Sequence, residues 1–217
     1  MGATVDTLTV TGASVFSGAV SLPSSAALYT NGIPQAALAE NTTQRFGIPI
    51  VPGLWTKHDE AYTPLTNPSA NDDLGIYGVF GTTSPYLGTY DIGGGVSLPF
   101  YARTVWQLPQ NYVAAGALSI AVNAGMLTTV CSVSCTVDAV VQKLDLDTTV
   151  AADIVSGSAV SMNSLTFGEK TIAINPATLS AGDWLDIRLL IQVNDAGDAG
   201  VMYAAIASVD MLATTYG

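Results

Sequence analysis

The stretch that decides the fold is WLDIRLLIQVN, residues 184–194, in which apolar side chains recur at every second position. Successive side chains of an extended chain point to opposite faces, so this stretch has two different faces. One face is wholly apolar and carries Leu185, Ile187, Leu189, Ile191 and Val193. The other face is mixed and carries Trp184, Asp186, Arg188 and Leu190. The apolar face must be buried, and we expect residues 185, 187, 189 and 191 to hold the core of a β-structure.

Further stretches with strand character surround this one, with Gly, Pro, Asn and Asp between them. They are residues 75–80, 99–108, 117–123, 128–143, 170–175 and 201–212. No stretch shows sustained helical spacing. The sequence therefore predicts an all-β domain over residues 74–217, built as an antiparallel two-sheet β-sandwich of jelly-roll type, with a closed barrel as the alternative.

Residues 46–73 are rich in turn-forming residues, including Pro49, Pro52, Pro64 and the pair Asn67-Pro68. This composition predicts a loop-rich connector before the sandwich. We expect its aromatic residues, Trp55 and Tyr62, to fix the connector onto the neighbouring domain, which is a commoner role for such rings than ligand binding.

Residues 1–45 have a different composition. An example is VTGASVFSGAVSLP at residues 10–23, which contains no charged side chain. Large apolar residues recur every six positions, at Val10, Phe16, Leu22 and Leu28. The Gly, Ser, Thr and Pro between them disfavour a helix. Ordering each residue costs about 1–2 kcal/mol of conformational entropy. A segment with so few bulky apolar groups therefore becomes ordered only against another surface. We interpret it as an extended arm whose contacts are made by those four residues; a disordered Gly/Ser/Ala tail is the alternative.

Composition excludes several functions. The chain has 217 residues, of which only 11% are charged, and its formal net charge is −11. Such acidity would repel a nucleic-acid backbone, so we expect no nucleic-acid partner. The longest uncharged runs, residues 7–39 and 104–137, are interrupted by polar residues and Gly, so we also expect no membrane span. The first residues lack a basic stretch and a continuous apolar run, which argues against a secretory signal.

Residues with catalytic or metal-binding chemistry are sparse. His58 is the only histidine and reads as a solvated loop residue. Asp145 and Asp147, or Asn194, Asp195 and Asp198, could supply oxygen ligands to calcium, but turn formation explains them better. Cys131 and Cys135 would lie about 13 Å apart on a strand, too far for a disulfide, and read as small buried hydrophobes. We expect no catalytic residue, no metal and no cofactor.

Two regions resemble virion proteins of tailed bacteriophages. The stretch LTVTGASVFSGAVSLP, residues 8–23, resembles the repetitive arms of tail-fibre and head-fibre proteins, and INPATLSAGDWLDIRLLIQVND, residues 174–195, is similar to β-sandwich capsid decoration or cement proteins. The resemblance implies a non-enzymatic homotrimer in the virion, with the major capsid protein or another virion protein as partner. The arm would dock on shell subunits, and the sandwich would stabilise the capsid.

A second function remains open, namely a fibre-associated module that binds a carbohydrate or receptor on the host surface. It would need exposed aromatic rings, for which the candidates are Tyr86, Tyr90, Tyr101, Trp106 and Tyr112. An enzyme would instead require carboxylates that converge on His58 in a cleft.

Overall fold

The structure is a computed structural model of the whole chain, which divides into two compact units, Met1–Glu40 and Asn41–Gly217. It describes residues 29–30, 33–34, 41–60, 63–67, 71–79, 81–90, 97–144, 149–197 and 200–216. In the first unit these are β1 (Tyr29–Thr30) and β2 (Ile33–Pro34), which pair antiparallel. The predicted arm contacts, Val10, Phe16, Leu22 and Leu28, lie outside the described residues.

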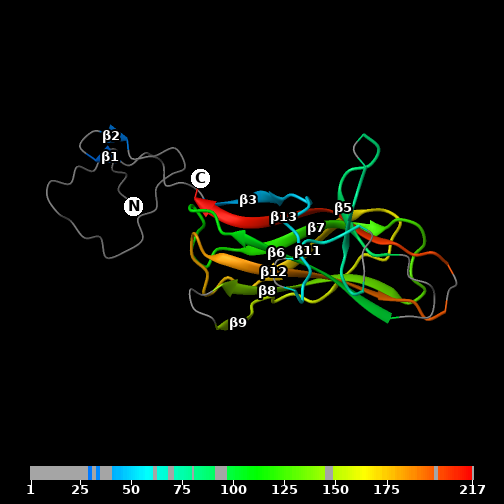
Figure 1. The fold of residues 1–217 in the computed structure, drawn as a ribbon. Coiled ribbons are helices and arrows are strands. Elements are labelled where there is room, and N and C mark those ends of the chain that lie inside the picture. The colour runs from blue at the N-terminus through cyan, green and yellow to red at the C-terminus, as the bar shows by residue number, and fades with distance from the viewer. Residues whose placement is uncertain are drawn as a thin grey trace, which may run out of the picture. The chain divides into compact units, whose positions relative to one another are not determined.

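The second unit is a two-sheet β-sandwich in which all strand pairs are antiparallel (Figure 1). The five-stranded sheet has the order β10-β8-β12-β6, and β9 also pairs with β8. Its strands are β6 (Ser97–Gln107), β8 (Ser134–Leu144), β9 (Val150–Asp153), β10 (Val160–Ser161) and β12 (Trp184–Asn194). The six-stranded sheet has the order β11-β7-β13-β5-β4, and β3 also pairs with β13. Its strands are β3 (Asn41–Ile48), β4 (Gly75–Tyr77), β5 (Tyr86–Gly88), β7 (Leu118–Met126), β11 (Gly168–Ile174) and β13 (Ala204–Tyr216).

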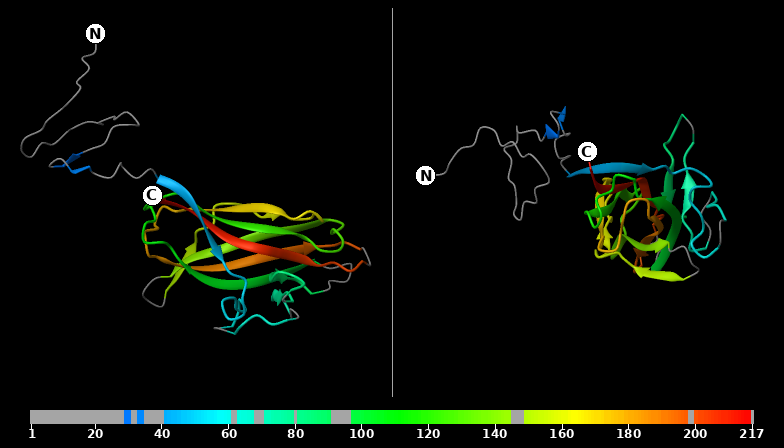
Figure 2. Two further views of the ribbon diagram at one scale, coloured as in Figure 1. Left: turned by 90° about the horizontal axis from the view of Figure 1, so that it is seen from above. Right: turned by 90° about the vertical axis from the view of Figure 1, so that its left-hand side faces the viewer.

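The long strands alternate between the sheets along the chain. β6, β8 and β12 belong to the five-stranded sheet, whereas β7, β11 and β13 belong to the six-stranded one. Each step between these strands therefore crosses the interior, which is the winding of a jelly roll. Figure 2 shows the two curved layers facing each other around that interior. The predicted all-β sandwich is confirmed, and the described residues contain no helix long and apolar enough to span a bilayer.

The core forms where the apolar faces of the two sheets meet. On β12, Leu185, Ile187, Leu189 and Ile191 are completely buried, as their alternation predicts. Opposite them, the six-stranded sheet buries Ile120, Val122, Val209 and Met211. The other face of β12 points outward from the sandwich, so its polar residues are available for a surface site.

The segment before the sandwich is more ordered than a connector. Residues 41–48, which the sequence analysis divides between arm and connector, form β3 and pair with β13 along its length. Farther on, Thr56 exchanges two backbone hydrogen bonds with Arg103 of β6, at 2.9 and 3.0 Å. Tyr101 of β6 donates its backbone N–H to Asp72 and accepts one from Leu74, both at 2.7 Å. The segment from the end of β3 to Leu74, called the covering segment below, therefore covers the edge of the five-stranded sheet, where free N–H and C=O groups would invite aggregation.

Trp55 fixes this covering segment to the sandwich. Its side chain is completely buried, and its indole N–H donates a hydrogen bond to the carbonyl of Pro49 at 3.0 Å. Ile50, Leu65 and Leu74 of the same segment are also buried in the core. The predicted role of Trp55 is confirmed, whereas Tyr62 lies outside the described residues.

The two cysteines are both buried and free, as predicted, but the predicted separation is wrong. β8 begins at Ser134, so residues 131–133 are not extended, and the two thiols contact each other. Burial raises the pKa of both thiols, and the rise is larger for Cys135. A thiol held in its neutral form is a poor nucleophile and a poor metal ligand, so these residues act as core-filling groups.

Candidate functional site

Polar side chains gather on the outer face of the five-stranded sheet, where they line a pocket of about 290 Å³. The lining residues are His58, Arg103, Val140, Gln142, Asp186 and Arg188. The strand register explains this grouping. On β12, Arg188 lies opposite Arg103 of β6 and Val140 of β8, while Asp186 lies opposite Gln142. Because residues at even positions of β12 point outward, the strand delivers an acid and a base to one surface.

Asp186 and Arg103 form the main ion pair of the pocket. The Nε of Arg103 donates to Oδ1 of Asp186 at 2.8 Å, and a terminal nitrogen donates to Oδ2 at 2.5 Å. This two-pronged geometry is the strongest form of the guanidinium–carboxylate contact. It holds both side chains in one orientation, so one wall of the pocket is rigid.

Arg188 is held differently. Its guanidinium carbon lies 5.1 Å from the ring centroid of Tyr101, which is a cation–π contact. Among the described residues no carboxylate lies within 4.0 Å of the guanidinium group, and its Nε is buried without a hydrogen-bond partner. An unsatisfied buried donor costs about 1–3 kcal/mol.

The covering segment contributes a second polar group beside the pocket. The side chain of His58 is only 13% exposed. Its Nδ1 lies 3.3 Å from Oδ1 of Asp73, and its Nε2 lies 3.6 Å from Oδ2 of Asp72. The imidazole ring also lies against Tyr101, with centroids 4.2 Å apart. The interpretation of His58 as a solvated residue is therefore wrong, because backbone pairing with β6 brings its segment over the sheet.

In the part of the chain that the structure describes, the group that could hold a metal ion is His58, Asp72 and Asp73. Carboxylate oxygens and an imidazole nitrogen suit a divalent cation. Lys57 opposes this use, because its ammonium lies 3.9 Å from the carboxylate of Asp73 and already supplies positive charge there. The pKa of Lys57 is raised, chiefly by its hydrogen bond to Glu60 and further by the charge of Asp73, so the ammonium form is favoured.

The predicted aromatic platform does not form. Tyr112 is buried, Trp106 packs against Phe46, and Tyr90 meets Phe100 edge to face. Tyr86 stacks on Tyr77 with centroids 5.3 Å apart, and Tyr101 lies against His58. The five candidate rings thus serve several different parts of the fold, and only Tyr101 borders the polar pocket.

Among the calcium candidates, Asp195 has a structural role. Asp195 is buried, and its carboxylate accepts a hydrogen bond from the backbone N–H of Ser132 at 2.7 Å. It thereby joins the loop after β12 to the loop before β8. Asp145, Asp147 and Asp198 lie outside the described residues.

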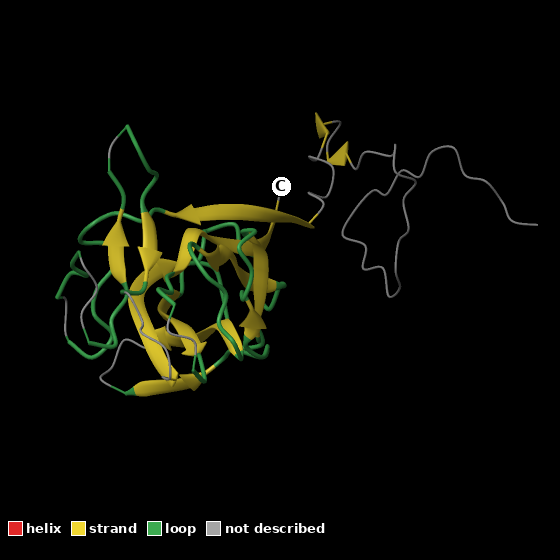
Figure 3. Cartoon of the chain, turned by 90° about the vertical axis from the view of Figure 1, so that its right-hand side faces the viewer, coloured by secondary structure: helices red, strands yellow, loops and turns green. Residues whose placement is uncertain are grey.

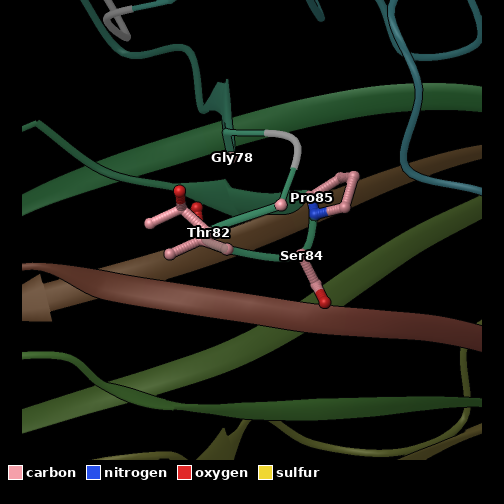
Figure 4. Close-up of a pocket in the computed structure, with 6 residues that line it drawn as sticks. Gly78, Thr82, Ser84 and Pro85 are labelled. Carbon is pink, nitrogen blue, oxygen red and sulfur yellow. The ribbon is translucent and has the colours of Figure 1, made fainter.

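A larger space of about 460 Å³ lies in the loop between β4 and β5 (Figure 4). Its lining consists of Gly78, Gly81, Thr82, Thr83, Ser84 and Pro85 and contains no charged or aromatic side chain. The backbone N–H groups of Thr82 and Thr83 both donate to the carbonyl of Val79 at 2.9 Å. Gly78 has φ of +134°, and a Cβ there would lie 2.9 Å from Pro85. The space is the inside of a tight turn whose polar groups bond one another, so it offers little to a ligand.

Comparisons with known proteins identify no family. No family model matches the sequence, and no curated protein matches it.

Several solved structures share parts of the fold at low similarity. One is a family 30 carbohydrate-binding module of the cellulosomal cellulase Cel9D-Cel44B of Clostridium thermocellum, with 9% identity, coverage of 77% of this chain and 96% of that chain, and a TM-score of 0.37. Another is TmCBM61 in complex with β-1,4-galactotriose, with 11% identity, coverage of 64% and 80%, and a TM-score of 0.36. A third is the structure of infectious bursal disease virus Gx strain, with 14% identity, coverage of 75% and 40%, and a TM-score of 0.31. These values assign no function to the chain.

Proposed function

We propose that the chain is a non-enzymatic structural protein of a tailed-bacteriophage virion, which decorates and stabilises the capsid as a homotrimer. The observation that carries the proposal is the division of the chain at residue 40. The sandwich after it buries a core of its own, whereas residues 7–39 before it contain no charged side chain. A segment so poor in charge gains order by lying against other subunits, and we assign it the docking role. Light scattering tests the trimer, with an expected mass near three times the 22.3 kDa of one chain.

An apolar surface at one end of the sandwich supports contact with another protein. The loops after β7, β10 and β12 meet at this end, because Ala204 pairs with Met126, Asn194 pairs with Ser134, and the backbone N–H of Met126 donates to the carbonyl of Ser164. They expose large apolar side chains, namely Leu127, Val130, Val133, Leu165 and Val201. Apolar side chains gathered at one place on a surface mark interaction sites.

The geometry at His58 supports a non-enzymatic role. A histidine that acts as a general base keeps one ring nitrogen directed toward the substrate or nucleophile. Here both ring nitrogens face carboxylates, those of Asp72 and Asp73. The carboxylates do converge on His58, and the arrangement holds the ring in place with a carboxylate within 3.6 Å of each nitrogen.

Removal of residues 1–40 tests the docking role of the arm. The truncation ends before Asn41 because β3 is needed to pair with β13. We expect the truncated protein to keep the unfolding midpoint of the full chain and to lose attachment to particles that lack the protein, measured by co-sedimentation. Truncated protein that attaches as well as the full chain would contradict the proposal. A variant with the apolar end changed, Val133→Ser with Leu165→Ser, is the comparison that separates arm contacts from sandwich contacts.

A second candidate function is supported by the polar pocket. Two arginines, an acid and an amide surround a space open to a ligand on the outer face of a rigid sheet. Binding sites with a few placed polar groups on a preformed surface are typical of ligand recognition. We therefore keep carbohydrate binding as the alternative function, with this pocket in place of the predicted aromatic platform.

A further inference from the structure

Positive charge is unevenly distributed in this acidic chain. The whole sequence has six Lys and Arg residues against seventeen Asp and Glu. Three of the six, Lys57, Arg103 and Arg188, lie at or beside the pocket on the outer face of the five-stranded sheet, together with the only histidine. The described lining itself contains two guanidinium groups and one carboxylate. Within the lining, positive groups therefore outnumber negative ones, and Asp72 and Asp73 lie beside it, on a protein of formal net charge −11.

The two guanidinium groups are not equivalent. Arg103 is neutralised by Asp186 through two hydrogen bonds. Arg188 lies on the neighbouring strand at the paired position, so the two cations repel each other. Its Nε is buried and has no acceptor among the described residues. A buried N–H of a charged group is costly to leave unpaired, so Arg188 is incompletely satisfied in the free protein.

We propose that the pocket binds the carboxylate group of an acidic saccharide, with Arg188 as its recognition residue. This inference rests on carbohydrate binding, the alternative function above. A carboxylate is planar and matches the fork of a guanidinium group, so it would pair with the terminal nitrogens of Arg188, for which the described residues provide no carboxylate. The neighbouring carboxylates of Asp186, Asp72 and Asp73 disfavour the double charge of a phosphate.

The remaining lining fits a sugar ring. Gln142 offers an amide that can both donate and accept, and Asp186 offers acceptor oxygens, so both can bind hydroxyl groups. Val140 lies opposite Arg188 and offers an apolar surface for one face of the ring. The volume of about 290 Å³ lies at the small end of ligand pockets, which suits a single terminal sugar.

Titration calorimetry on the full chain tests this proposal with matched probes. The probes are sialyllactose against lactose, and trigalacturonate against a neutral trigalactoside. We expect at least one acidic member to bind and its neutral partner to bind at least tenfold more weakly. Added NaCl should weaken the acidic interaction, because exposed charges are screened.

Substitutions at Arg188 identify the recognition residue. We expect Arg188→Gln to weaken acidic binding at least tenfold, and Arg188→Lys, which keeps the charge but loses the planar fork, to give an intermediate affinity. The matched control is Lys170→Gln, which removes the same charge from β11 in the other sheet and should change affinity by less than twofold. Thermal unfolding of each variant, compared with that of the parent, confirms folding.

The outcomes separate the two proposals. Equal binding of acidic and neutral probes that Arg188→Gln leaves unchanged would overturn the carboxylate inference while supporting carbohydrate binding. Binding of none of the four probes would overturn both. Acidic binding that Arg188→Gln and Lys170→Gln weaken equally would show a general charge effect and would also overturn the assignment to Arg188.

Discussion

Ile191→Asp is expected to abolish folding of the sandwich at neutral pH. Ile191 is completely buried on β12, between Phe100 of β6 and Val137 of β8. A carboxylate in this apolar place would lack a cationic partner, and desolvation of such a charge costs several kcal/mol. Since domains of this kind are stable by only about 5–15 kcal/mol, most or all of the stability would be lost. Circular dichroism and urea denaturation of the purified variant measure the effect.

The matched control is the adjacent substitution Gln192→Asp. Gln192 points to the outer face, where its amide donates to the hydroxyl of Ser97 at 3.2 Å. A carboxylate there remains hydrated, so the free energy of unfolding should fall by no more than about 1 kcal/mol. If the two variants unfolded at the same urea concentration, the assignment of the two faces of β12 would be wrong.

Trp55→Ala is expected to lower the free energy of unfolding by about 3–5 kcal/mol, the range for large aromatic residues in a core. The substitution leaves a cavity and removes the indole hydrogen bond to Pro49. It also loosens the segment that carries Thr56 and His58 across β6, so it should expose the edge of the sheet and promote aggregation. Urea denaturation measures the first effect, and light scattering at increasing protein concentration measures the second.

Trp184→Ala is the control for this change, because Trp184 begins β12 and is 48% exposed. The same atoms are removed, but little buried surface is lost, so the cost should be about 1 kcal/mol or less. Equal destabilisation by the two substitutions would show that Trp55 does not hold the covering segment in the way described.

The fold could be predicted because its strongest signals are local. Alternation in residues 184–194 fixes which side chains of β12 face inward, and the buried positions follow directly. The absence of helical spacing then leaves two layers of sheet. Short strands were harder to predict: β5 has only three residues, Tyr86–Gly88, and its pairing with β4 and β13 depends on distant partners rather than on its own pattern.

The candidate site could not be predicted from local patterns. His58 and Asp73 belong to a segment whose composition indicates only turns, while Tyr101 and Arg188 belong to two strands far along the chain. Backbone pairing of Thr56 with Arg103, and of Asp72 and Leu74 with Tyr101, brings these parts together. No periodicity signals such isolated contacts. A usable hint was the presence of an arginine and an acid on the outward face of β12, since Asp186 and Arg188 must be balanced by neighbouring strands.

The cysteines show how an error in a strand boundary changes an expected distance. The alternation of residues 128–143 predicts one continuous strand, whereas β8 begins at Ser134. Asn163 bonds the backbone of Cys131 at both its N–H and its carbonyl, at 2.7 and 2.9 Å. The chain is therefore held in a loop at this point, and the two thiols approach each other. The burial of both residues was predictable because it depends on composition and not on geometry.

The position of β13 has a consequence for the order of events during synthesis. This strand comes after the other strands of the described residues, yet it lies between β7 and β3 in its sheet, as the labels in Figure 1 show. Figure 3 gives an end-on view of the same strands and loops. Its partners in β3 are separated from it by more than 160 residues, as in the pair Arg45 and Leu212. Strands β3 and β7 must therefore wait, unpaired at their inner edges, until the ribosome has released residues 204–216. Such distant pairing makes folding slow, on the scale of milliseconds to seconds, and the unpaired edges are open to aggregation during that time.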